Sequence, residues 1–186
     1  MMRSAIRQVS ILAFALCSAC TRFDNPIVGE AGPALDSAVV GSWEFKNDKG
    51  TMRADIVNVD GAGRLVTTML ERGKPPEIDE YRFITATLEQ MKFASIRSLG
   101  HPDASWLLFR YELPSPDVLV VYGDDPGFWR ESVNNRQIAG SVEQKDRLSV
   151  TTVTASESEL RAFVLGYGSV IFNDDEPKEL RRVPVR

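Results

Sequence analysis

The chain has 186 residues, a size that suits one domain, and 43% of them are hydrophobic while 26% are charged. This balance argues against a wholly disordered chain. The formal net charge of -4 argues against a surface that is basic throughout, so we expect no nucleic-acid partner.

The N-terminus has the layout of a cleaved export signal. Arg3 and Arg7 give it a positive start, and no acidic residue lies within it. The apolar run over residues 9–16 is too short to span a membrane, because a spanning helix needs roughly 20 apolar residues. Small residues follow this run, as they do before a signal-peptide cleavage site. We therefore expect residues 1–19 to be a signal peptide that is removed.

The stretch Leu16–Cys20, which reads Leu-Cys-Ser-Ala-Cys, resembles the lipobox of bacterial lipoproteins, with Cys17 where that family prefers leucine. The resemblance implies that Cys20 becomes the first residue, carries two acyl chains on sulfur and is acylated on its amino group. Thr21 is not the aspartate that retains such proteins at the inner membrane. The resemblance thus implies an outer-membrane anchor facing the periplasm, with the lipid bilayer as a partner. The alternative is a soluble periplasmic protein cut after Ala19.

The cysteine count restricts the chemistry of the mature domain. The chain has two cysteines; Cys17 would leave with the signal and Cys20 would be acylated. In this interpretation no thiol remains for a disulfide, a cysteine nucleophile or a zinc–thiolate site. Loss of Arg3 and Arg7 leaves 20 basic and 26 acidic side chains, a net charge of -6. We expect no cofactor.

Residues 20–37 are expected to form the lipidated N-terminus and a flexible tether. They contain Pro26, Gly29, Gly32 and Pro33, and they show no helical or strand period. A single β-rich globular domain is expected over residues 38–186.

Short segments with strand-like alternation dominate this domain, and the breaks between them are rich in turn residues. Their close spacing favours antiparallel pairing, because hairpin loops are too short for parallel crossovers. We expect strands over residues 39–45, 52–59, 64–70, 80–87, 91–97, 105–113, 118–122, 148–153, 169–172 and 180–183.

Two helices are expected among the later strands, near residues 125–135 and 156–165. Asp125 is a suitable N-cap with proline directly after it. The second helix begins with a capping box, in which Ser156 and Glu159 bond each other's backbone amides. A glycine, Gly166 or Gly168, is expected to end it.

The fold class is therefore mainly β: an antiparallel curved sheet or barrel with two short helices. The sequence Gly41-Ser42-Trp43 resembles the Gly-x-Trp signature of lipocalins. The resemblance implies an eight-stranded barrel in which Trp43 closes one end and a late arginine, Arg181 or Arg182, packs on it by a cation–π contact. Another antiparallel β fold is the alternative.

Aromatic side chains are the candidate ligand-binding residues. They are expected either to line an apolar cavity or to fill a core. The five that we single out are Trp43, Tyr81, Phe83, Trp106 and Tyr111.

The polar candidates for catalysis or metal binding are few. His101 is the sole histidine, and the sequence offers it no recognisable nucleophile. Asp124-Asp125 and the acidic run 173–176 lack the spacing of a known calcium loop, so they are interpreted as ordinary turns and no metal is expected.

These observations predict a membrane-tethered envelope lipoprotein that acts as a non-enzymatic binding or interaction module. Its partner would be an unidentified envelope protein. The alternative is a lipocalin-like carrier of a small apolar ligand or lipid, which requires an empty apolar cavity.

Overall fold

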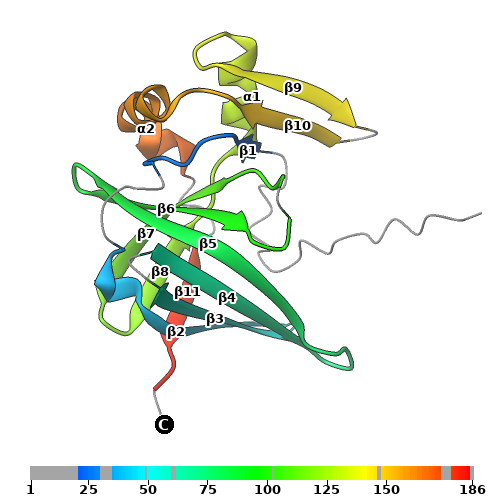
Figure 1. Ribbon diagram of the computed structural model, residues 1–186, viewed down its shortest axis with the longest axis vertical. Helices are drawn as coiled ribbons and strands as arrows, with labels where there is room; N and C mark the ends of the chain where they lie inside the picture. Colours follow the sequence, from blue (N-terminus) through cyan, green and yellow to red (C-terminus); the bar gives the residue numbers. More distant parts are fainter. Residues whose placement is uncertain are drawn as a thin grey trace, which may run out of the picture.

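The computed structural model describes residues 21–29, 35–48, 50–59, 62–101, 103–145, 148–172 and 177–184. Its main body is a closed, eight-stranded antiparallel β-barrel, and a smaller layer of strands and helices covers one side of that barrel (Figure 1). The expected mainly β class with two short helices is confirmed.

Seven barrel strands follow one another in the sequence as an antiparallel meander, and the eighth comes from the C-terminal end of the chain. This last strand, β11, pairs with β8 on one side and with β2 on the other, which closes the barrel. The strands are β2 (Gly41–Asn47), β3 (Gly50–Val59), β4 (Ala62–Glu71), β5 (Glu77–Leu88), β6 (Met91–Ser98), β7 (Leu107–Ser115), β8 (Val118–Tyr122) and β11 (Lys178–Arg182).

The covering layer is inserted between β8 and β11. It contains a three-stranded sheet in the order β1-β10-β9, in which β1 is parallel to β10 and β9 is antiparallel to it. The strand β1 is the exception, because it precedes β2 in the sequence. The elements are β1 (Thr21–Phe23), α1 (Pro126–Asn134), β9 (Gly140–Lys145), β10 (Leu148–Val153) and α2 (Glu157–Ile171).

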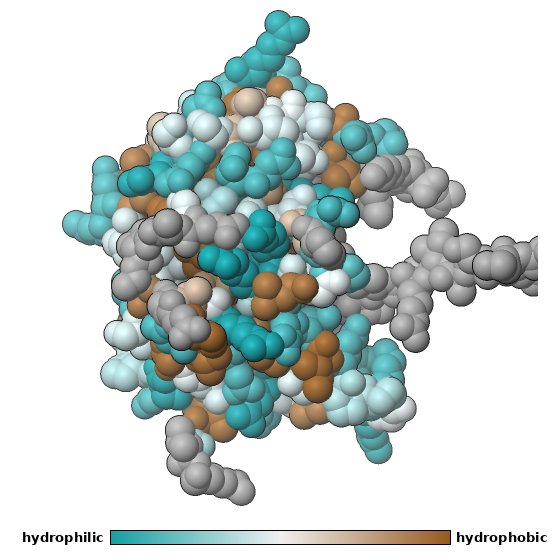
Figure 2. Space-filling model, viewed as in Figure 1, coloured by the Kyte–Doolittle hydropathy of each residue, from teal (hydrophilic) through white to brown (hydrophobic). Residues whose placement is uncertain are grey.

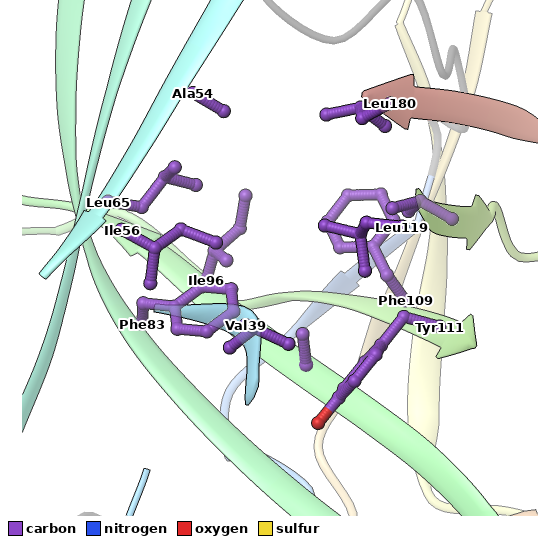
Figure 3. A pocket seen from close by; sticks show the side chains of 12 residues that line it. Val39, Ala54, Ile56, Leu65, Phe83, Ile96, Phe109, Tyr111, Leu119 and Leu180 are labelled. Carbon is purple, nitrogen blue, oxygen red and sulfur yellow. The ribbon is translucent and has the colours of Figure 1, made fainter. Parts of the chain in front are cut away.

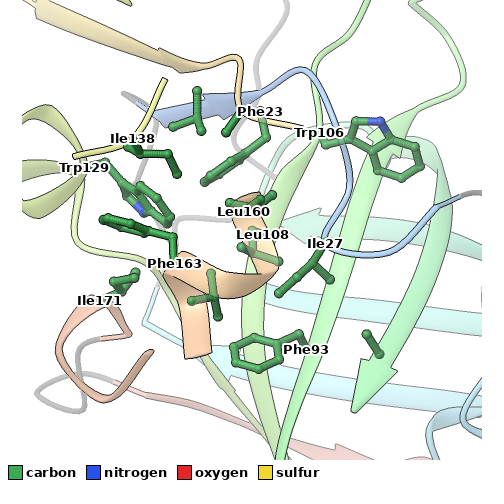
Figure 4. Packing of buried hydrophobic residues seen from close by; sticks show 14 of the residues in the cluster. Phe23, Ile27, Phe93, Trp106, Leu108, Trp129, Ile138, Leu160, Phe163 and Ile171 are labelled. Atoms are coloured by element: carbon green, nitrogen blue, oxygen red, sulfur yellow. The ribbon is translucent and has the colours of Figure 1, made fainter. Parts of the chain in front are cut away.

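Alternation along the barrel strands gives the molecule two cores, because successive side chains of a strand point to opposite faces. On β5, Phe83 points into the barrel and belongs to the inner core, whereas Ile84 points outward. On β6, Phe93 points outward and Ala94 inward. The outward side chains form an outer core with the covering layer, shown in Figure 4.

The outer core is rich in aromatic side chains from elements that lie far apart in the sequence. The rings of Phe23 in β1 and Trp129 in α1 meet edge to face, with centroids 5.0 Å apart. Trp129 also packs on Phe163 of α2, at 5.4 Å. These contacts fix β1 and both helices on the outer wall of the barrel.

The N-terminal segment differs from the expected flexible tether. Thr21 to Phe23 pair residue by residue with β10, and Phe23, Ile27 and Val28 are buried in the outer core. The segment is therefore part of the folded domain over residues 21–29. Its apolar side chains are spaced irregularly, so no period indicated this packing. Cys20 and residues 1–19 lie outside the described residues.

Both helix N-caps are confirmed, but the end of α2 is not. Asp125 accepts from the amides of Gly127 and Phe128, and the capping box at Ser156 is complete. The expected strand over residues 169–172 is wrong, since α2 continues to Ile171. Neither glycine ends the helix. A Cβ at Gly168 would lie 3.2 Å from the Met91 methyl group, which shows that this glycine serves close packing.

Candidate binding site in the barrel

The barrel encloses a small cavity of about 40 Å³ with a wholly apolar wall. Figure 3 shows side chains from opposite strands pointing into it. The side chains that line the cavity include Val39, Phe83, Ile96, Phe109, Tyr111 and Leu180.

The volume of this cavity limits what it holds. One water molecule takes about 30 Å³ in the liquid, and a dry engineered cavity that binds benzene has about 150 Å³. The barrel interior of this structure is therefore almost filled by its own side chains. A lipid chain would fit only after several of these side chains had moved.

One end of the barrel is closed by η1 (Ser37–Val39), a single 3-10 turn that precedes β2. Val39 of this turn is buried and forms part of the cavity wall. The indole Nε1 of Trp43 donates a hydrogen bond of 2.8 Å to the carbonyl of Val39. Trp43 thereby fixes the turn across the barrel end.

Arg182 covers the outside of Trp43. Its guanidinium lies 4.2 Å from the centre of the Trp43 ring, and its nitrogens donate to backbone carbonyls that include those of Ala38 and Val40. The cation–π contact expected for Arg181 or Arg182 is confirmed for Arg182. Arg181 is exposed and pairs with Glu179 instead.

A polar cluster holds the same end of the barrel from the other side. The carboxylate of Asp36 accepts hydrogen bonds from Lys92 Nζ at 2.8 Å and from the Tyr111 hydroxyl at 2.9 Å. The backbone amide of Asp36 donates to the hydroxyl of Thr85. The amide of Ala38 also donates to the Asp36 carboxylate, so Asp36 caps η1.

Electrostatics within this cluster favour ionised Asp36 and neutral Tyr111. Burial raises the pKa of Asp36, but the hydrogen bonds from Lys92, Ala38 and Tyr111 together outweigh it and lower the pKa below its ordinary value. Burial, reinforced by the Asp36 charge, raises the pKa of Tyr111 well above its usual range. The tyrosine thus remains a hydrogen-bond donor to the Asp36 carboxylate.

The five aromatic candidates occupy different places. Phe83 and Tyr111 contribute to the cavity wall. Trp43 and Tyr81 belong to the inner core beyond that wall, and burial with the nearby Asp79 charge raises the pKa of Tyr81 to about 12. Trp106 belongs to the outer core, with Arg97 stacked over it at 4.6 Å, and is therefore separated from the other four candidates, which all belong to the inner core.

The polar candidates do not come together as a reactive site. His101 is exposed in a loop, and Asp125 serves as the N-cap of α1. The acidic run 173–176 lies outside the described residues. Within the part of the chain that the structure describes, no three potential ligands from His, Cys, Asp and Glu gather closely enough to hold a metal ion.

Sequence reasoning missed the Asp36 cluster. Asp36 lies 56 residues from Lys92 and 75 from Tyr111, and it fell in the segment interpreted as a tether. Its one usable local signal was the aspartate itself, because aspartate is a preferred N-cap residue.

Comparisons with protein-family models, with curated proteins and with solved structures gave no match for this chain. The assignment of the fold therefore rests on the barrel geometry. This geometry is lipocalin-like in its eight antiparallel strands and in the contact between Trp43 and Arg182 at the closed end. No helix among the described ranges has the length and apolar character to cross a membrane.

Proposed function

We propose that this protein is a non-enzymatic binding module, held at an envelope membrane by acyl chains on Cys20, and that it binds an envelope protein through its outer surface. The observation that carries the proposal is the filled barrel. A cavity of about 40 Å³ leaves the interior without room for a sizeable ligand, so recognition falls to exterior surfaces.

The lipobox-like stretch Leu16–Cys20 supports the anchor, and Thr21, which is not aspartate, supports an outer-membrane destination with the domain facing the periplasm. Attachment through several acyl chains gives stable membrane binding, since each buried methylene contributes about 0.8 kcal/mol.

Metabolic labelling tests the anchor. Radiolabelled palmitate should enter the parent protein and the Cys17→Ala variant, because Cys17 leaves with the signal. The Cys20→Ala variant should carry no label. Label retained by Cys20→Ala would refute the anchor at this residue.

The apolar cavity wall favours a second candidate, a carrier of a small apolar ligand or lipid. Native mass spectrometry of residues 21–186, purified from a bacterial periplasm, separates the two functions. The binding module predicts the mass of the bare chain. An added mass that matches a lipid and leaves on denaturation would support the carrier.

A matched pair of variants would locate any such ligand. Ala94 faces the cavity, so Ala94→Val should reduce the ligand-bound fraction. Ala139 is exposed outside the barrel, so Ala139→Val should leave that fraction unchanged. An equal effect of both substitutions would place the ligand elsewhere.

A further inference from the structure

The start of the folded domain is held firmly at one place on the barrel. Phe23 exchanges two backbone hydrogen bonds with Trp106, of 3.0 and 2.8 Å, on one side of β1, and Thr21 to Phe23 pair with β10 on the other. Consecutive Cα atoms are 3.80 Å apart, so Cys20 lies within one residue of this fixed strand. Acyl chains on Cys20 would bring the bilayer close to β1, with no spacer between them.

Trp106 immediately precedes β7, and η1 immediately precedes β2. Strand direction alternates along the meander, so β7 begins at the barrel end opposite the one where β2 begins. Trp106 therefore lies at the end opposite η1, which we call the far end. The β4–β5 hairpin and the β6–β7 connection belong to the same end, because the meander alternates direction. Figure 1 shows the β4–β5 hairpin at the lower right, across the barrel from the blue turn of η1 on the left.

Three aliphatic side chains stand exposed on the outer wall of this end, and we call them the aliphatic rim. Their exposed fractions are 46% for Leu70, 62% for Ile78 and 50% for Leu99. Ile78 lies opposite Thr68, two residues before Leu70, and the amide of Leu99 donates to the carbonyl of Glu80. Leu70 and Ile78 thus lie on the neighbouring strands β4 and β5, and Leu99 directly follows β6. Figure 2 shows brown patches among teal ones on the face where β4 and β5 lie in front.

A row of arginines crosses the same wall beside the rim. Arg64, Arg82 and Arg97 are direct cross-strand partners on β4, β5 and β6. Arg64 also forms an ion pair with Glu80 on the same wall. The row ends at Trp106, on which Arg97 stacks. Guanidinium groups bind phosphate by paired hydrogen bonds, which suits a phospholipid surface.

We infer that this wall, the aliphatic rim with the arginine row, rests on the phospholipid surface into which the acyl chains of Cys20 insert. The inference rests on the proposed anchor. The rim lies at the level of the acyl boundary and the arginines at the level of the phosphates. The mature chain has a net charge of -6, so an anionic bilayer repels most of its surface and favours this orientation.

Tryptophan quenching on vesicles tests this surface. Residues 20–186 contain one cysteine, so Cys20 is coupled chemically to a maleimide lipid in phosphatidylethanolamine–phosphatidylglycerol vesicles with brominated acyl chains. The native tryptophans Trp43, Trp106 and Trp129 are buried, and the parent protein measures their background. Ile78→Trp is compared with Val170→Trp on α2, where the native side chain is similarly exposed, at 59%.

Ile78→Trp should be quenched at least about twofold more than Val170→Trp, because bromine reports contact with the acyl region. Leu99→Trp is a second rim probe, and near-UV circular dichroism checks that each variant is folded. Equal quenching of the rim probes and Val170→Trp, or stronger quenching of Val170→Trp, would overturn the inferred surface. Because Cys20 is coupled chemically, the quenching result does not depend on acylation in the cell. If palmitate labelling shows that Cys20 is not acylated, the proposed anchor fails, and the inferred surface then has no role in the cell.

Discussion

The guanidinium of Arg182 lies 4.2 Å from the ring centre of Trp43 and joins three separate segments at the closed end of the barrel. Its Nε donates to the carbonyl of Pro116 in the β7–β8 turn, and its Nη atoms donate to Ala38 and Val40 around η1. One C-terminal side chain thus holds both the entry to β2 and the turn that precedes β8.

Arg182→Ala should lower the free energy of unfolding by about 2–4 kcal/mol. The substitution removes the cation–π contact and leaves three carbonyls without their charged donor. Arg181→Ala is the matched control, and it should change stability by less than about 0.5 kcal/mol because Arg181 is exposed. Urea titration measures both. Equal losses would show that Arg182 has no special part in closure.

Gly41→Ala should destabilise the same corner. Gly41 has φ of +137°, a conformation that L side chains rarely adopt, and a Cβ there would lie 2.5 Å from Arg182 Nη1. The expected loss is about 1–3 kcal/mol. Gly166→Ala on α2 is the control, since nothing lies within 4 Å of its Cβ position. It should gain up to about 1 kcal/mol of helix propensity. The two substitutions should therefore shift the melting temperature in opposite directions, which differential scanning calorimetry measures.

The stability conferred by Asp36 should depend on pH. Its folded-state pKa lies below the ordinary value of 3.8, so its contribution is fully present above that value and disappears as the pH falls through the folded-state pKa. Asp36→Asn should cost about 1–2 kcal/mol at pH 7, where the charged bond to Lys92 is lost. The difference from the parent should shrink at the acid end of a pH series of urea titrations.

Asp103→Asn removes an exposed carboxylate and is the control for this series; it should change stability by less than about 0.5 kcal/mol at pH 7. A constant difference between Asp36→Asn and the parent from pH 7 to pH 3 would contradict the assigned ionisation.

Ser156→Ala should destabilise the protein by about 0.5–2 kcal/mol through loss of the α2 cap. The Ser156 hydroxyl accepts from the amide of Glu159, whose carboxylate accepts from the amide of Ser156. Ser169→Ala changes an exposed serine within the same helix and should be nearly neutral. An unchanged urea midpoint for Ser156→Ala would mean that the cap carries no stability.

The curved sheet or barrel could be predicted from local pattern because side chains along most of its strands alternate between the inner core and the outer face. The two helix starts could be predicted for a similar reason, since caps and their helices are adjacent in sequence. The Gly41-Ser42-Trp43 resemblance went further, because it implied the long-range contact that Arg182 makes.

Elements with weak local signals could not be predicted from the sequence. The strand β1 has three residues, and its register with β10 joins positions 130 residues apart, such as Thr21 and Thr151. The strand β9 carries one apolar residue, Val142, so alternation did not reveal it. Gly168 was interpreted as a possible helix end, because the local sequence gives no sign of its close contact with Met91.

The long insertion between β8 and β11 has a consequence for the order of folding. In a chain delivered N-terminus first, from a ribosome or a translocon, β2 and β8 remain open edges until the residues after 178 arrive. The partner of β1 is likewise late, since β10 begins at Leu148. Contacts between such distant segments slow folding, and unpaired edges invite association with other chains. The nascent protein should therefore depend on holdase chaperones until its last strand has emerged, and it should complete its fold in one late step.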